Sequence, residues 1–195
     1  MNKQRWFSFT TRELVAMAIL VAAAGVIQVL WAQMVYNLQW LGPFSNLFGS
    51  FGFNIVSFGV LYLVRKPGAA TVVKLLAGVI ELAMGSPVGP VVIFYNLVEG
   101  FAADLAFVLF KGDFSFMMVT VGSILAWLFA APVDAYRDAV PMTLSGIVGY
   151  FGPGGMGKVW ISLWVYLALL GLKKAGVKPI TKVETVVTEG RVITG

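Results

Sequence analysis

The sequence predicts an all-α integral membrane protein, a bundle of six transmembrane helices with both termini in the cytoplasm. The chain of 195 residues is 59% hydrophobic and only 12% charged, with a mean hydropathy of +0.87. Soluble domains carry about 25% charged residues. Long apolar runs alternate with short polar turns, as expected of helices that cross a bilayer. The 22 glycines suit closely packed membrane helices.

Six apolar segments can be followed along the chain. The first is too long for the apolar core of a signal peptide and lacks a convincing cleavage site, so we interpret it as a transmembrane helix. The second ends at a Pro-Gly turn, and the fourth begins at a proline, which helices favour in their first turn. Residues 132–155 are mixed in composition, and the sequence leaves open whether 140–155 form a short helix over a pocket. The predicted helices span residues 14–36, 48–64, 69–84, 90–110, 114–131 and 156–172.

The Lys and Arg residues set the expected orientation. Eleven of the fourteen lie in the N-terminal segment, in the turns at 65–66 and 111, and in the C-terminal tail. Because basic residues are retained on the cytoplasmic side, we expect a multi-pass protein of the cell membrane with cytoplasmic termini. The net charge of +5 is explained in this way, and no nucleic-acid partner is expected. The predicted division is a cytoplasmic segment, a six-helix transmembrane domain and a basic cytoplasmic tail, at residues 1–12, 13–172 and 173–195.

The composition also excludes much of enzyme chemistry. Without Cys or His the chain lacks thiol nucleophiles, the usual zinc and haem ligands and any imidazole base, so no catalytic residue, metal or cofactor is predicted. The segment GPGGMGKV at 152–159 approaches a phosphate-binding loop, but Val159 stands where the magnesium-binding Ser or Thr must be. Any ATP that drives this protein is therefore expected to be hydrolysed by a partner.

Carboxylates within the predicted spans are the first candidates for function. A carboxylate at a helix centre costs about 2.5–3.5 kcal/mol on insertion scales, so each needs a role or a partner. Glu81 lies near the outer end of its helix, and Glu99 lies about 13 Å below the start of the next, on one face with Asn96 and one turn after Tyr95. Both acids are predicted to be reachable from outside, whereas Asp104 is interpreted as structural.

An alternative gives these acids a packing role alone. Glu81 would then pair with Lys74, two turns away on the same helix, or with Lys158 across the bundle. The sequence leaves both interpretations open.

Aromatic residues are dense in the outer parts of the predicted helices. Trp160 and Trp164 are four apart on one helix face, and with Trp127 they are candidates to wall a pocket for a flat, cationic aromatic ligand. An interfacial aromatic belt is the alternative explanation.

A stripe of small residues follows the first predicted helix, at Ala18, Ala22 and Gly25. Spacings of four and three place them on one face, against which another helix can lie closely. We expect a partner protein there, with packing inside the same bundle as the alternative.

A distinctive block is formed by RKPGAA at 65–70, Glu81 four residues before Gly85, GSPVGP at 85–90, and a following helix with Glu99-Gly100. This block resembles the YkoE-type substrate-binding (S) components of energy-coupling factor transporters. The similarity is strongest over about residues 60–110.

The resemblance implies a six-helix membrane protein that captures a vitamin from outside and associates with a transmembrane coupling protein and two ATPase subunits. YkoE-type members are associated with thiamine and its hydroxymethylpyrimidine precursor. S components generally present an Ala-x-x-x-Ala surface on the first helix to the coupling protein, and Ala18 with Ala22 matches that spacing. The superfamily pocket lies towards the outer side and is capped by the loop after the first helix, here residues 37–47.

The main hypothesis is therefore an S component for thiamine or hydroxymethylpyrimidine. Glutamates would pair with the cationic or amino-bearing ring, Asn96 would hydrogen-bond it, and a tryptophan would stack on it. The alternatives are an S component for a different vitamin and a non-transporting membrane scaffold or assembly subunit. The predicted substrate-binding residues are Glu81, Tyr95, Asn96, Glu99, Trp127, Trp160 and Trp164.

Overall fold

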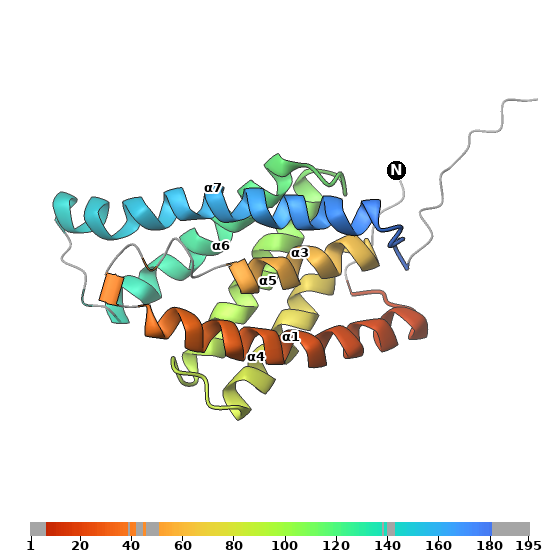
Figure 1. Ribbon diagram of the computed structural model, residues 1–195, viewed down its shortest axis with the longest axis horizontal. Coiled ribbons are helices and arrows are strands. Elements are labelled where there is room, and N and C mark those ends of the chain that lie inside the picture. Colours follow the sequence, from red (N-terminus) through yellow and green to blue (C-terminus); the bar gives the residue numbers. More distant parts are fainter. Residues whose placement is uncertain are drawn as a thin grey trace, which may run out of the picture.

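Within the part of the chain that it describes, a computed structural model contains six α-helices (Figure 1). The described residues are 7–38, 40, 41, 45, 51–137, 139 and 143–180, without the side chains of 146, 147, 150 and 151. Most of the predicted capping loop at 37–47 and the tail beyond residue 180 lie outside them. The helices are α1 (Thr11–Asn37), α3 (Phe51–Val64), α4 (Ala69–Ala83), α5 (Val91–Leu109), α6 (Phe116–Arg137) and α7 (Leu144–Lys174).

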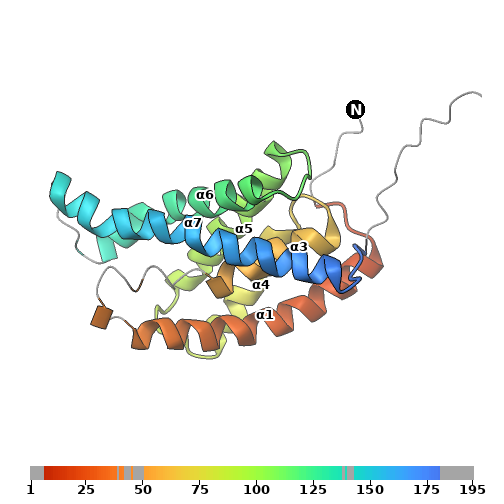
Figure 2. The same ribbon diagram turned by 45° about the horizontal axis from the view of Figure 1, so that its top comes forward.

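Four of these helices are long and apolar enough to cross a membrane. They are α1, α5, α6 and the part of α7 from Gly152 onwards, while α3 is a shorter apolar helix. In Figures 1 and 2, α1 and α7 run along opposite sides of the bundle, and Figure 1 shows α4 and α5 crossing them obliquely. The helix α3 lies in the middle, in contact with α1, α4, α5 and α7.

Both ends of the described chain meet at the turn between α3 and α4. The backbone N–H of Phe7 donates to the carbonyl of Pro67 at 3.5 Å, and the N–H of Ile180 donates to the carbonyl of Leu63 at 2.8 Å. The N-terminal and C-terminal segments therefore lie at one end of the bundle, which also carries most of the basic residues. That this end faces the cytoplasm stays a prediction.

The start of α1 is fixed to the same turn. Thr10 and Glu13 form a reciprocal capping box, in which each side chain accepts from the backbone N–H of the other residue. Glu13 is buried and its carboxylate also meets the Lys66 ammonium at 2.8 Å. The cap thus satisfies free helix donors and anchors α1 to the turn at 65–68.

The segment 132–155, predicted to be of mixed structure, is largely helical. The helix α6 continues through Pro132 to Arg137, and α7 begins at Leu144 and continues through Pro153. The predicted ends at 131 and 156 were wrong because rules for Pro and Gly in water do not transfer to a bilayer. There the helix keeps backbone polar groups bonded, and neighbouring helices compensate for the lost bond.

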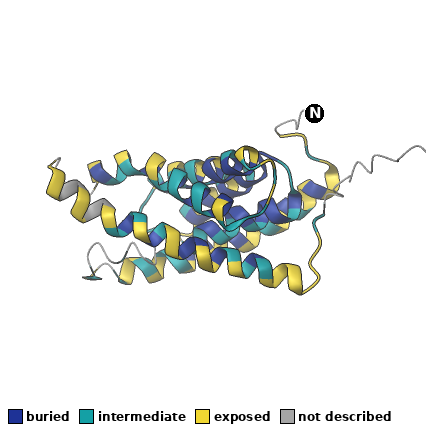
Figure 3. Ribbon diagram, turned by 90° about the horizontal axis from the view of Figure 1, so that it is seen from above, coloured by how far each residue is buried: buried dark blue, intermediate teal, exposed yellow. Residues whose placement is uncertain are grey.

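Buried residues face the centre of the bundle, and exposed residues cover its outer faces (Figure 3). An apolar core occupies the half nearer the basic end. Its large members include Met17, Phe58, Leu61, Tyr62, Phe107, Met118 and Ile161.

Glycines allow α4 and α5 to approach each other closely. A Cβ atom placed on Gly100 would lie 2.7 Å from the Cα of Thr71 and 2.8 Å from the carbonyl oxygen of Ala70. Gly78 similarly faces Asn96, whose Cβ would be 2.9 Å away. Close backbone contact of this kind is the main source of helix association where lipid supplies no hydrophobic drive.

We predict that Gly100→Ala destabilises the fold by about 1–3 kcal/mol, because the new methyl group meets the backbone of α4 and forces the two helices apart. The measurement is thermal unfolding of the purified protein in detergent. Gly59→Ala is the matched control, since a Cβ at Gly59 meets no atom within 4 Å among the described residues. Equal melting temperatures for the two variants would contradict the proposed close contact.

Candidate binding site

Buried polar residues gather in the half of the bundle away from the basic end. The helices α4 and α5 run in opposite directions. Lys74 and Glu81 therefore come after the core residues of α4 in the sequence, whereas Asn96 and Glu99 come before those of α5. Three buried polar residues at the basic end, Glu13, Thr71 and Asp104, form the contacts that hold the starts of α1 and α4. Among the described residues, the buried or partly buried polar residues of the other half include Gln28, Asn54, Lys74, Glu81, Asn96, Glu99, Ser123, Asp134, Lys158 and Ser162.

An ion pair between α4 and α5 lies at the centre of this polar half. The Lys74 ammonium is 2.8 Å from the Glu99 carboxylate, and the Lys74 side chain is fully buried while that of Glu99 is 16% exposed. The ammonium also lies 4.8 Å from the centre of the Phe53 ring on α3, a cation–π contact. Lys74 thus pairs with Glu99 and not with Glu81, the partner considered from the sequence.

Glu81 is held by neutral donors. The side-chain amide of Asn96 donates to it at 3.2 Å, and the Ser86 hydroxyl donates to it at 3.3 Å. The same amide nitrogen donates to the carbonyl of Val92 at 3.0 Å, while the amide oxygen of Asn96 is buried with no partner among the described residues. The structure therefore brings Glu81 and Asn96 together, as their predicted positions on adjacent helices require.

Tyr95 belongs to a second cluster at the ends of α5 and α6. Its hydroxyl donates to the Asp134 carboxylate at 2.7 Å and accepts from the Arg137 guanidinium at 2.9 Å. Arg137 also meets Asp134 at 3.4 Å. Neither charged residue matched a motif in the sequence, because their relation to Tyr95 depends on how α5 and α6 pack.

A chain of polar side chains crosses three helices below this cluster. Asn54 of α3 donates to Ser123 of α6 at 3.1 Å, and Ser162 of α7 donates to the same hydroxyl at 3.0 Å. Gln28 of α1 is fully buried, and both atoms of its amide group lack a hydrogen-bond partner among the described residues. Sequence reasoning missed these residues, although a polar residue inside an apolar helix was a usable signal.

Asp104 is structural, as interpreted from the sequence. Its carboxylate accepts from the backbone N–H groups of Ala70 and Thr71, at 3.3 and 2.8 Å, and from the Thr71 hydroxyl at 2.6 Å. It therefore caps the first turn of α4, whose N-cap residue is Gly68 and makes no side-chain bond.

Three comparisons with known proteins bear on this arrangement. The model of a family described as "ABC-type cobalt transport system, permease component" matches residues 12–129. The chain belongs to this family. Over 103 residues it is 32% identical to the "Putative HMP/thiamine permease protein YkoE" of Bacillus subtilis strain 168. That match covers 51% of each protein, so the chain aligns with about half the length of this relative.

A solved structure extends the comparison to most of the fold. The "Crystal structure of an S-component of ECF transporter" superposes with a TM-score of 0.69, covering 87% of this chain and 88% of the other at 23% identity. The predicted class, an all-α membrane bundle, is confirmed. The family and both similar proteins belong to transport systems, so the predictions of a multi-pass membrane protein and of a non-enzyme are confirmed as well.

The tryptophans expected in the site of this permease-family protein do not all lie there. Trp160 and Trp164 are 51% and 48% exposed, with their rings edge to face at 5.6 Å. They lie away from the buried face of α7 that carries Ser162, because residues two apart on a helix differ by about 200° in direction. Trp127 is partly buried, and its ring would lie 3.3 Å from a Cβ on Gly155 of α7.

The small stripe on α1 is divided between two environments. Ala18 and Ala22 are exposed, whereas Gly25 is buried against Ile80 of α4, where a Cβ atom placed on Gly25 would lie 2.6 Å from the Ile80 side chain. Gly25 thus packs inside the bundle, which was the alternative considered for the stripe. Among the described residues, no group of three or more His, Cys, Asp or Glu is arranged to hold a metal ion.

Proposed function

We propose that this chain is the substrate-binding component of an energy-coupling factor importer, and that it captures thiamine or hydroxymethylpyrimidine. The observation that carries the proposal is the cluster of buried polar groups in the half of the bundle opposite the basic end, two of which, Gln28 and Asn96, keep amide atoms without a hydrogen-bond partner among the described residues. Such groups are expensive in a membrane and mark ligand sites unless they are fully paired. At the basic end the buried Glu13 and Asp104 are paired. The similarity to a putative HMP/thiamine permease supports this ligand class.

Glu81 is the proposed anchor for an amino-bearing or cationic ring. Its hydrogen bonds come from neutral donors, so a ligand that brings a charged or amino donor offers a stronger, charge-assisted bond. The amide oxygen of Asn96 and the amide group of Gln28, which have no hydrogen-bond partner in the part of the chain that the structure describes, would supply further polar contacts. Glu99 is shared with Lys74, and we propose that it acts mainly by neutralising that lysine.

Aromatic contacts would complete the site. Trp127 is the proposed stacking residue, since it is partly buried and lies on α6, the helix that also carries Asp134. The half-exposed Trp160 and Trp164 suit the aromatic belt considered as their alternative, with amphipathic rings at the membrane boundary. Tyr95 would close the outer end of the site through its bonds to α6.

The proposed partners are a transmembrane coupling protein and two ATPase subunits. The exposed pair Ala18 and Ala22 offers a flat surface on α1 where a partner helix can lie closely. Movement of the whole bundle along this surface would carry the ligand inwards.

The proposed ligand class can be tested by tryptophan fluorescence. Titrating the purified protein with thiamine and with hydroxymethylpyrimidine should quench tryptophan fluorescence saturably, whereas riboflavin should not after correction for absorbance. Glu81→Gln should weaken binding at least about tenfold, because a charged acceptor is replaced by a neutral one.

Asp113→Asn is the matched control, since Asp113 is an exposed acid at the other end of the bundle. Its affinity should equal that of the wild type. If folded wild-type protein responds to neither ligand, this ligand class is wrong. If Glu81→Gln also leaves transport intact, the result favours the alternative of a membrane scaffold or assembly subunit.

Contact with the coupling protein can be separated experimentally from ligand binding. Ala18→Leu should abolish uptake by the assembled transporter while leaving ligand affinity unchanged, because a bulky side chain keeps the partner helix away. Ala23→Leu is the matched control, exposed on the same helix but about 100° round from Ala22. Loss of ligand binding in Ala18→Leu, or equal loss of uptake in both variants, would contradict the proposal that Ala18 and Ala22 contact the coupling protein.

A further inference from the structure

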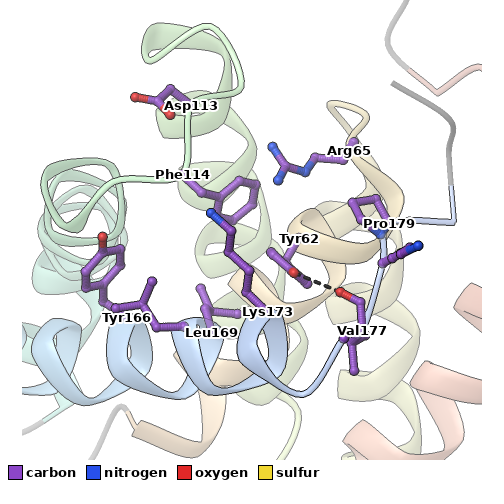
Figure 4. A pocket seen from close by; sticks show the side chains of 12 residues that line it. Tyr62, Arg65, Asp113, Phe114, Tyr166, Leu169, Lys173, Val177 and Pro179 are labelled. Atoms are coloured by element: carbon purple, nitrogen blue, oxygen red, sulfur yellow. Dashed lines mark hydrogen bonds between the residues drawn. The ribbon is translucent and has the colours of Figure 1, made fainter. Parts of the chain in front are cut away.

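A cavity lies at the basic end of the bundle, remote from the polar half. Its volume is about 420 Å³, and it opens between the end of α3, the turn before α6 and the end of α7 (Figure 4). Tyr62 and Phe114 form an aromatic wall, and three basic residues surround it. These are Arg65, Lys173 and Lys178.

Arg65 is held in place with part of its bonding capacity unused. One terminal nitrogen of the guanidinium donates to the carbonyl of Gly112 at 3.1 Å. The guanidinium carbon lies 4.6 Å from the centre of the Phe114 ring and 5.6 Å from that of Tyr62. Its Nε is buried and has no hydrogen-bond partner among the described residues. Burial lowers the pKa of Arg65, so a nearby anion would stabilise its charged form.

The backbone of Arg65, directly after α3, is left-handed. Its φ angle is +54°, in the left-handed region where helices usually end at a glycine. A residue with a side chain costs of order 1–3 kcal/mol in such a conformation.

The C-terminal wall of the cavity is firmly built. The N–H of Val177 donates to the carbonyl of Leu172 at 3.1 Å, and the Tyr62 hydroxyl donates to the carbonyl of Val177 at 2.9 Å. These bonds dock the chain after α7 onto α3 and keep Lys173 and Lys178 beside the opening. The wall does not depend on a ligand for its shape.

The charges at the cavity are unbalanced. Asp113 is the single acid among the lining residues, and Figure 4 shows its carboxylate directed away from Arg65. Among the described residues, neither Lys173 nor Lys178 takes part in an ion pair. Lys173 and Lys174 both lie in the last turn of α7, where positive charge is favourable, and of the two only Lys173 lines the cavity.

We propose that this cavity binds a phosphate group, supplied either by the headgroup of an anionic phospholipid or by soluble phosphate. The Arg65 guanidinium and the ammonium groups of the two lysines match the oxygens of a phosphate, and the arginine provides the planar fork that such groups favour. Lysine and arginine residues that face an anionic leaflet are attracted to it in the same way. The proposal is independent of the ligand captured at the other end.

The test uses the full-length protein in a neutral detergent. Its melting temperature is followed as sodium phosphate replaces sodium chloride at constant ionic strength, and separately as phosphatidylglycerol replaces phosphatidylcholine in the micelles. A saturable rise with either probe is expected, because a ligand that binds the folded state stabilises it. A rise with phosphate identifies the soluble anion as sufficient, and a rise with the lipid alone identifies the headgroup.

Two variants make the test specific. Lys173→Gln should weaken the apparent affinity for the active probe about tenfold, and Lys174→Gln, its neighbour outside the cavity, should not change it. General salting-out by phosphate would raise both melting temperatures equally. Arg65→Lys keeps the charge but removes the fork and should also weaken binding. The proposal is overturned if neither probe gives a saturable rise, or if Lys173→Gln and Lys174→Gln lose it equally.

Discussion

A buried ion pair between two neighbouring helices is the constraint on which the polar half of this bundle depends. Lys74 and Glu99 meet at 2.8 Å in the interior of α4 and α5, where each alone would cost about 2.5–3.5 kcal/mol on insertion scales. Together they hold the helices in one register, which also places Glu81 beside Asn96. Asp104 caps the start of α4 from α5, so the two helices are joined by polar contacts along most of their length.

The rest of the molecule follows from separating polar and apolar interiors. The apolar core near the basic end gives the bundle its packing, and close contact at Gly100 brings α4 and α5 together there. Among the described residues, the polar half keeps hydrogen-bonding atoms without partners, at Gln28 and Asn96. Under the proposed function both properties are needed, because the packed core keeps the bundle rigid while the polar half can exchange its hydrogen-bond partners for those of a ligand.

Much of the fold could be predicted from hydropathy and turn residues, which indicated six consecutive helices, and the short turn at 85–90 makes α4 and α5 neighbours. The continuous helix through Pro153 could not be predicted, because the residue preferences that end helices in water do not apply in lipid. Trp160 and Trp164 show a second limit, since an aromatic pair looks the same in sequence on an interior or an outward face. Contacts between residues far apart in the sequence could not be predicted. Examples are the hydrogen bonds among Asn54, Ser123 and Ser162, and those among Tyr95, Asp134 and Arg137.

The central claim, that Lys74 and Glu99 stabilise the α4–α5 pair as a unit, is tested most directly by a double-mutant cycle on the free energy of unfolding in detergent. Lys74→Met removes the direct partner of Glu99 and Glu99→Gln that of Lys74, so each should be destabilising, whereas the double variant removes both charges. We expect the double variant to lose less stability than the sum of the single losses, by about 0.5–3 kcal/mol. Losses that add within about 0.5 kcal/mol would show that the two residues act separately and would contradict the account.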